Sequence, residues 1–144
     1  MTSNPQGTVF FIDRCLGKHL ILDELRKTGV QVETHDNHFP PGATDEQWIP
    51  EVGKKGWVVL TKDKRITYNT MERRAVAYAE IRMFTLASTK LSGKDAAIAF
   101  SNALEGMLKF VRKYPAPFIA KVYKDGKVDL WKDANELLDE IGEI

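Results

Sequence analysis

Short apolar runs alternate along the chain with longer segments of helical periodicity. Residues 8–13, 30–35, 57–61 and 81–86 are each a brief run of mainly apolar or alternating residues, bounded by polar or turn residues. Runs of this length and composition predict four β-strands. The runs TVFFID and WVVLT are almost continuously apolar, which favours strands buried on both faces of a sheet.

Helices are predicted between and after these strands. Apolar residues recur at helical spacing in four long segments and one short one, and several segments begin with a capping residue. Within the second segment Thr44 and Gln47 have capping-box spacing, whereas Pro50 predicts a kink or a restart. The segments are 17–28, 44–55, a stretch opening at Asn69, 92–114 and 135–141.

The order of these elements predicts the fold class. Strands that alternate with helices indicate an α/β protein with a mostly parallel central sheet and helices on both faces. Residues 118–131 add a C-terminal β-hairpin, because Asp125-Gly126 between two alternating segments is the usual signal for a two-residue turn. A length of 144 residues fits one domain, residues 1–144.

Composition narrows the function classes. Hydrophobic residues make up 43% of the chain, charged residues 28%, and the net charge is +1, so bulk charge favours no acidic partner. The single cysteine, Cys15, excludes an intrachain disulfide, and no apolar stretch approaches the roughly 20 residues of a membrane span. With no signal-peptide pattern at the N-terminus, we expect a cytoplasmic protein without membrane association.

Carboxylates follow or precede the predicted parallel strands at positions where chemistry is expected. Asp13 ends the first strand, Asp63 follows Thr61 at the end of the third, and Asp45 with Glu46 opens the helix before that strand. Ligands bind outside the carboxyl ends of parallel strands, so these acids are expected to converge. Carboxylates gathered at one edge favour a hard divalent cation, Mg²⁺ or Mn²⁺.

Each acid also has a structural interpretation. Asp45 and Glu46 stand where acids stabilise a helix N-terminus, and Asp63 fits an ordinary loop residue. Glu72 is explained by its capping-box spacing from Asn69. Asp13 has no such explanation, and this favours a functional role.

Cations and aromatic residues supply candidate nucleic-acid contacts. Trp48 is available to stack on a base, although aromatic residues are also frequent in cores. His35 and His38 have a metal-ligand spacing, but nothing nearby completes a zinc site. Basic residues flank the acids in sequence and are candidates for phosphate contacts, with ordinary surface exposure as the alternative. They are Arg14, Lys18, Lys62, Lys64 and Arg65.

The motifs VFFID and TDEQWIPEVGKKGWVVLTKDKRI resemble the PIN-domain superfamily. In that superfamily an Asp ends the first strand, another opens a helix, and Thr-x-Asp follows the next strand, here Thr61-Lys62-Asp63. The likeness covers roughly residues 8–88 and is closest to small PIN-like proteins that include the VapC-like toxins of bacterial toxin–antitoxin pairs.

This resemblance implies an Mg²⁺- or Mn²⁺-dependent ribonuclease acting on RNA. Asp13, Asp45 and Asp63 would hold the metal, Thr61 would orient Asp63, and Glu46 would support the site. An antitoxin protein and a homodimer formed through residues 92–114 are the implied partners. The superfamily's further Glu, on a helix between the first two Asp residues, has no obvious match here, so the number of metal ions stays open.

A non-enzymatic α/β signalling module is the alternative. A response-regulator receiver also places an Asp at the end of its third strand, as Asp63 is placed here. It requires two adjacent acids after the first strand, however, and Asp13 is followed by Arg14. It also requires a Lys at the end of a fifth strand, whereas Lys121 lies inside the predicted hairpin.

Overall fold

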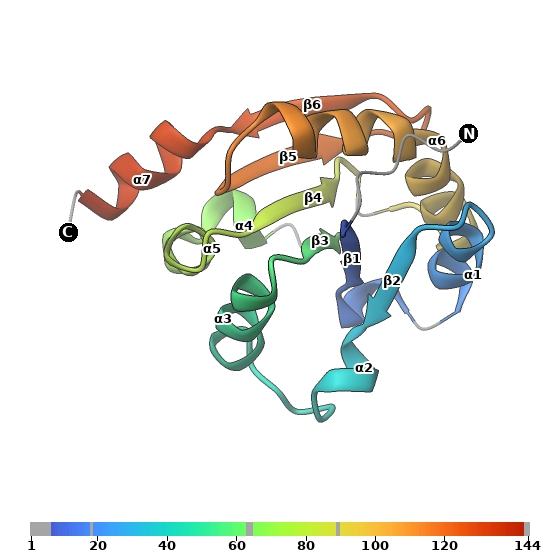
Figure 1. The fold of residues 1–144 in the computed structure, drawn as a ribbon, viewed down its shortest axis with the longest axis horizontal. Coiled ribbons are helices and arrows are strands. Elements are labelled where there is room, and N and C mark those ends of the chain that lie inside the picture. Colours follow the sequence, from blue (N-terminus) through green and yellow to red (C-terminus); the bar gives the residue numbers. More distant parts are fainter. Residues whose placement is uncertain (1–6, 18, 63–64, 89, 143–144) are drawn as a thin grey trace.

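A computed structural model describes residues 7–17, 19–62, 65–88 and 90–142 of the chain (Figure 1). Six strands form one sheet in the order β2-β1-β3-β4-β5-β6, in which β1 to β5 are parallel and β6 is antiparallel to β5. The strands are β1 (Val9–Ile12), β2 (Gln31–Thr34), β3 (Val58–Thr61), β4 (Arg82–Leu86), β5 (Phe118–Val122) and β6 (Val128–Lys132). This arrangement confirms the predicted α/β class with its C-terminal hairpin.

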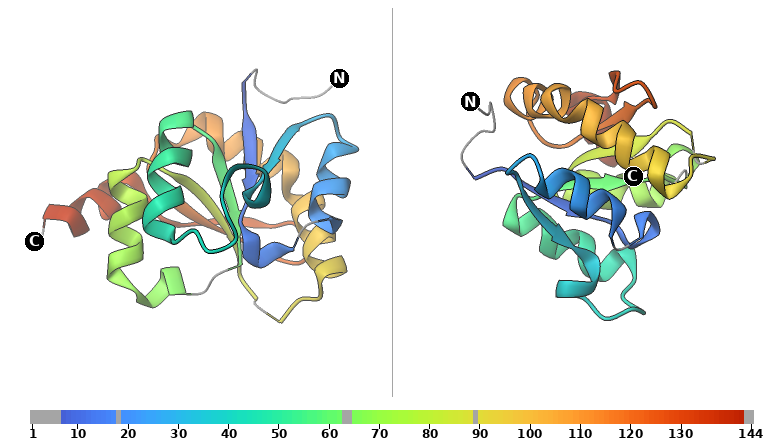
Figure 2. Two further views of the ribbon diagram at one scale, coloured as in Figure 1. Left: turned by 90° about the horizontal axis from the view of Figure 1, so that it is seen from below. Right: turned by 90° about the vertical axis from the view of Figure 1, so that its right-hand side faces the viewer.

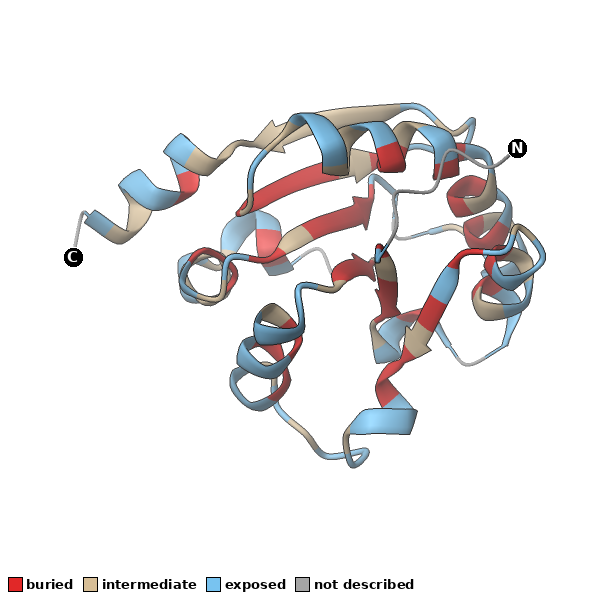
Figure 3. Ribbon diagram, in the orientation of Figure 1, coloured by how far each residue is buried: buried red, intermediate tan, exposed pale blue. Residues whose placement is uncertain are grey.

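Helices cover both faces of the sheet (Figure 2). Successive β1 side chains alternate between two apolar clusters: Phe10 and Ile12 join the cluster with α1 and α6, and Phe11 joins the other. The cores therefore lie on either side of the sheet, and the central strands β1, β3 and β4 are buried along most of their length (Figure 3). On the first face lie α1 (Leu20–Arg26) and α6 (Gly93–Lys113); on the second lie α3 (Asp45–Lys55), α4 (Arg65–Tyr68), α5 (Thr70–Tyr78) and α7 (Ala134–Gly142).

Three short helical segments were not expected from the sequence. A 3-10 helix η1 (Arg14–Leu16) follows β1, α2 (His35–His38) follows β2, and α4 precedes α5. Each has only three or four residues, too few for a hydrophobic period to become visible. Among the described residues, no helix is both long and apolar enough to cross a membrane.

Two local predictions need correction. Helix α3 continues without interruption through Pro50, which is exposed in the middle of the helix and removes only one backbone hydrogen bond there. The hairpin turn has three residues rather than two: Tyr123 N donates to Lys127 O, leaving Lys124 to Gly126 as the loop. Gly126 has a φ of 93°, the left-handed conformation that closes three-residue hairpin loops.

The order of the strands places a potential ligand site at the carboxyl ends of β1 and β3. From β1 the chain passes to α1 on one face, whereas from β3 it passes to α4 and α5 on the opposite face. In open parallel sheets, such a change of direction leaves a crevice beyond the carboxyl ends of the two strands. Asp13 follows β1 and Thr61 ends β3, so both lie at this point.

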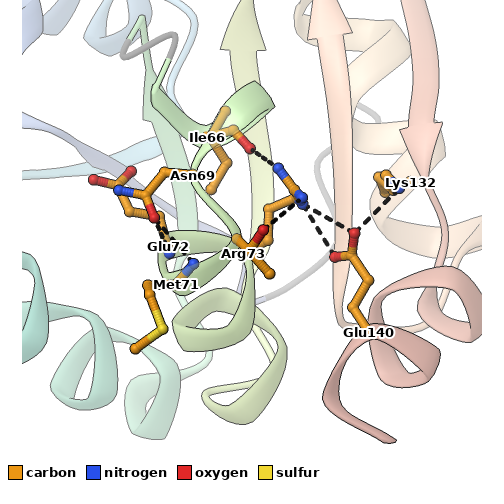
Figure 4. Close-up of polar contacts among 8 residues, drawn as sticks. Ile66, Asn69, Met71, Glu72, Arg73, Lys132 and Glu140 are labelled. Atoms are coloured by element: carbon orange, nitrogen blue, oxygen red, sulfur yellow. Dashed lines mark hydrogen bonds and ion pairs between the residues drawn. The ribbon is translucent and has the colours of Figure 1, made fainter. Parts of the chain in front are cut away.

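A polar cluster fixes α5 against the C-terminal segment (Figure 4). Arg73 of α5 donates from Nε to both Glu140 oxygens of α7, at 3.0 and 3.1 Å, and from Nη1 to the Ile66 carbonyl at 3.1 Å. Lys132 Nζ of β6 lies 3.3 Å from Glu140 Oε1. Glu140 and Arg73 are only 16% and 12% exposed, so this contact is shielded from water and anchors α5.

A glycine allows α3 to approach α5. A Cβ atom on Gly53 would lie 2.9 Å from Ala79 Cβ and closer still to the Ala79 carbonyl oxygen. Gly53→Ala is therefore expected to destabilise the fold by about 1–3 kcal/mol through overpacking, against the usual gain from replacing a helical glycine.

Chemical denaturation of Gly53→Ala beside Gly42→Ala checks this expectation. Gly42 has open space around its Cα and serves as the control. Equal stability of the two variants would contradict the close packing of α3 on α5.

Candidate metal centre and active site

Asp13 and Thr61 are joined at the crevice between β1 and β3. The Thr61 hydroxyl donates to Asp13 Oδ2 at 2.8 Å, and Asp13 N donates to the Leu60 carbonyl at 2.9 Å. The resemblance assigned Thr61 to Asp63, which lies outside the described residues. In the structure, Thr61 orients the carboxylate of the first strand.

Cys15 lies beside this pair. Its Sγ is 3.5 Å from Asp13 Oδ2 and 3.3 Å from Thr61 Oγ1, and it accepts from Lys62 N at 3.5 Å. Burial of the sulfur and the nearby Asp13 charge raise the pKa of Cys15 to about 11. The thiol is therefore protonated at neutral pH, which argues against a nucleophilic cysteine.

Asp45 is brought to the site by the first turn of α3. Gln47 Oε1 accepts from Thr44 N at 2.8 Å, the capping-box contact that the sequence predicts. Trp48 Nε1 donates to Asp45 Oδ1 at 3.0 Å, while its ring packs 5.4 Å from that of Phe11. Trp48 is 3% exposed, so it is a core residue that orients Asp45 rather than a platform for stacking bases.

Glu72 reaches the same place from α5. The Asn69 side chain caps α5 by accepting from Met71 N at 3.0 Å and Glu72 N at 3.4 Å, as expected. In Figure 4 the side chain of Glu72 points away from Arg73 and from the Glu140 cluster. Its carboxylate faces Arg65, and a small cavity has Glu72, Asp13, Asp45 and Thr61 in its wall.

The sequence underestimates Glu72 because its spacing from Asn69 already explains an acid there. What the spacing cannot show is which way the carboxylate points once α5 packs against α3. Glu46, by contrast, was expected to support the site, but it lines the neighbouring groove and is absent from the wall of the small cavity.

The basic residues occupy different places. Arg65 Nη2 lies 3.6 Å from Asp45 Oδ2, and its Nε lies 3.5 Å from Glu72 Oε1, so it bridges two of the carboxylates. Arg14 Nη1 donates to the Pro41 carbonyl. Both line an open hollow of about 380 Å³ that also contacts Asp13 and Asp45. Lys18 and Lys64 lie outside the described residues.

The surroundings of Asp13 disfavour its negative charge. Burial raises the pKa of Asp13, and the Asp45 charge raises it further, against the lowering effect of the Thr61 and Cys15 hydrogen bonds. A cation would relieve both effects, and carboxylate oxygens are ligands that Mg²⁺ and Mn²⁺ prefer. Among the described residues, no three His, Cys, Asp or Glu side chains form a metal-binding group; Asp63, the third expected ligand, lies outside this part of the chain.

The two histidines have separate surroundings. His38 Nε2 lies 2.7 Å from Glu33 Oε1 at the surface. His35 is buried among the rings of Phe11, Phe39 and Trp48, and within the described part of the chain its Nδ1 has no hydrogen-bond partner.

The raised pKa of Asp13 predicts how the stability of the fold depends on pH. A carboxyl group with a raised folded-state pKa stabilises the fold fully below its unfolded pKa, about 3.9, and loses that contribution as the pH rises through the folded value. Asp13→Asn should therefore raise Tm by a few degrees at pH 7, with the gain disappearing below about pH 4.

Thermal unfolding across this pH range tests the prediction. Asp139→Asn, an exposed position on α7, should leave Tm nearly unchanged and is the control. A lower Tm for Asp13→Asn at pH 7 would contradict a net cost of the buried charge.

Comparisons with known proteins agree with this geometry. A family model described as "PIN like domain" matches residues 8–88, which include Asp13, Asp45, Thr61 and Glu72. The protein named "Putative ribonuclease VapC45" of Mycobacterium tuberculosis is 28% identical over 117 residues, covering 78% of this chain and 84% of the relative. No solved structure matches. Because the matched segment spans more than half of the sequence, the chain belongs to the PIN-like domain family.

Proposed function

We propose that this protein is a metal-dependent endoribonuclease and the toxin of a toxin–antitoxin pair. One observation carries the proposal: carboxylates from three separate elements, Asp13, Asp45 and Glu72, line one cavity at the sheet crevice of a PIN-like domain. The similarity to a protein named as a VapC ribonuclease supports the same activity.

The oxygen donors of the site fit a divalent cation. Asp13, Asp45 and the Asp63 that follows β3 are the proposed ligands, and Glu72 is a further candidate from α5. A bound Mg²⁺ or Mn²⁺ would polarise the phosphodiester and lower the pKa of a bound water. Both ions are candidates in this proposal.

The chain's own groups have separate tasks in this proposal. Thr61 and Trp48 hold the carboxylates of Asp13 and Asp45 in place through hydrogen bonds. Lys62, Arg14 and Arg65 border the acids and are proposed to contact RNA phosphates. The remaining basic residues proposed for this role are Lys18 and Lys64.

The proposed activity implies a substrate, a cellular compartment and a protein partner. RNA is the substrate, the cytoplasm is the compartment, and an antitoxin protein restrains the enzyme. The proposal treats residues 1–144 as one domain, because β5, β6 and α7 continue the sheet and core of the matched segment. A homodimer through α6 has a limited apolar surface to use, because most apolar residues of α6 are buried and Ile98 is 41% exposed.

The cleavage prediction concerns single carboxylates. Purified protein should cut total cellular RNA with Mg²⁺ or Mn²⁺ and not with EDTA. Asp13→Asn and Asp45→Asn should each lower the rate at least about a hundredfold, because each removes an anionic ligand of the proposed cation. Glu51→Gln, an exposed carboxylate of α3 paired with Lys54, should cleave like the wild type.

Gel analysis of the RNA products measures these rates. Unchanged cleavage by folded Asp13→Asn would contradict the proposed site. Binding of Mn²⁺ by calorimetry, without cleavage, would indicate that the site lacks the proposed activity on the RNAs tested.

Arg65 makes a separate prediction about metal affinity. It is paired with Asp45 and Glu72, so a cation must compete with its guanidinium. Exposed ion pairs contribute about 0.2–1 kcal/mol, and Arg65→Gln should therefore bind Mn²⁺ about twofold to fivefold more tightly.

Calorimetric titration with Mn²⁺ in the absence of RNA measures this effect. Arg65→Lys keeps the positive charge and should stay close to the wild type. Weaker Mn²⁺ binding by Arg65→Gln would show that Arg65 supports the cation rather than competing with it.

A further inference from the structure

A second hollow adjoins the carboxylate cavity. It is a groove of about 730 Å³ between the start of α3 and one side of α5, a volume in the range of small-ligand sites. Asp45 and Glu72 line both the groove and the small cavity that contains Asp13 and Thr61. The two hollows are therefore adjacent, with these carboxylates between them.

The α5 wall of the groove carries apolar and cationic side chains at one-turn spacing. Met71, Arg74 and Tyr78 lie at positions i, i+3 and i+7 and so share one helix face. Met71 is 68% exposed and Tyr78 is 64% exposed, although both are large and apolar in most of their surface. Exposed apolar side chains gathered in a groove indicate a binding surface.

Arg74 carries guanidinium N–H donors that its contacts within the protein do not fully use. Its Nη1 donates to Met71 Sδ at 3.9 Å, and its buried Nε has no hydrogen-bond partner among the residues that the structure describes. A thioether sulfur is only a weak acceptor, so the terminal nitrogens of Arg74, which lines the groove, keep donors for a stronger acceptor. A phosphate oxygen is the kind of acceptor that an arginine binds best.

We propose that this groove binds the segment of single-stranded RNA next to the cleaved phosphate, with a base stacked on Tyr78 and a backbone phosphate at Arg74. The proposal rests on the proposed nuclease function and extends it to substrate recognition. From Met71 to Tyr78 the face runs about 10 Å at 1.5 Å per residue, a length that fits stacked bases about 3.4 Å apart.

The groove favours RNA over a protein segment because of this combination of groups. Aromatic faces stack on any base, and arginine beside them contacts the backbone, which is how single strands are bound without sequence preference. A base-paired duplex presents its bases stacked inside and cannot place one on Tyr78. The groove therefore predicts a preference for unpaired RNA.

Binding is measured by fluorescence anisotropy with a short fluorescein-labelled single-stranded RNA of mixed sequence, using the wild-type chain in EDTA so that no metal-dependent cleavage intervenes. Tyr78→Ala should weaken binding about tenfold, whereas Tyr78→Phe keeps the ring and should bind like the wild type. Tyr68→Ala is the matched control, because Tyr68 is 66% exposed nearby and lies outside the groove.

Arg74 is tested through the salt dependence of the same binding. Arg74→Ala should weaken binding and reduce the slope of log Kd against log salt by about 0.7, the value of one phosphate contact on a single strand. Arg26→Ala, on the opposite face of the sheet in α1, should leave the slope unchanged. Annealing the RNA to its complement should weaken binding to the wild type.

The outcomes separate this proposal from the nuclease proposal. Loss of RNA affinity in Tyr78→Ala and Arg74→Ala supports the groove even if the wild type cleaves nothing. Wild-type affinity in both variants overturns it, even if the protein cleaves RNA, and so does the absence of RNA binding by the wild type. Unchanged RNA affinity with loss of a protein partner by either variant overturns it in favour of a protein interface.

Discussion

The hydrogen bond between Thr61 and Asp13 ties together the two strands at which the chain changes direction, and the site depends on it. On one side of this bond the chain continues to α1, and on the other to α4 and α5. The carboxylate is held where the crevice opens, in surroundings that disfavour its charge. Helices α3 and α5 bring Asp45 and Glu72 to the Asp13 carboxylate, and this proximity makes them candidate site residues.

The sequence predicts the parts of the molecule that local pattern determines. Apolar runs show the strands, and an acid directly after VFFI has no other local explanation, so Asp13 could be identified without a structure. The contacts of Trp48 and Glu72 could not be derived from the sequence: a core position was one of two open interpretations of Trp48, and capping-box spacing already accounts for an acid at Glu72. Whether Trp48 donates to Asp45, and whether Glu72 faces the cavity, depends on how α3 and α5 pack, and this is a contact between distant residues.

Different sides of α5 make different contacts. Arg73 is directed to α7, where it meets Glu140, while Glu72 of the same helix reaches the carboxylate cavity and the groove. Gly53 brings α3 close enough for both helices to line one groove. Gly53 thus permits the close approach of α3 to α5, and the part-buried Arg73–Glu140 ion pair holds α5 against α7.

The separation of Arg73 and Glu140 along the chain has a consequence for biosynthesis. A nascent polypeptide emerges from the ribosome N-terminus first, so α5 is made long before the α7 residue that anchors it. Until the last turns of α7 have been released, one wall of the groove lacks its support. A growing chain therefore completes this wall only after α7 has left the ribosome.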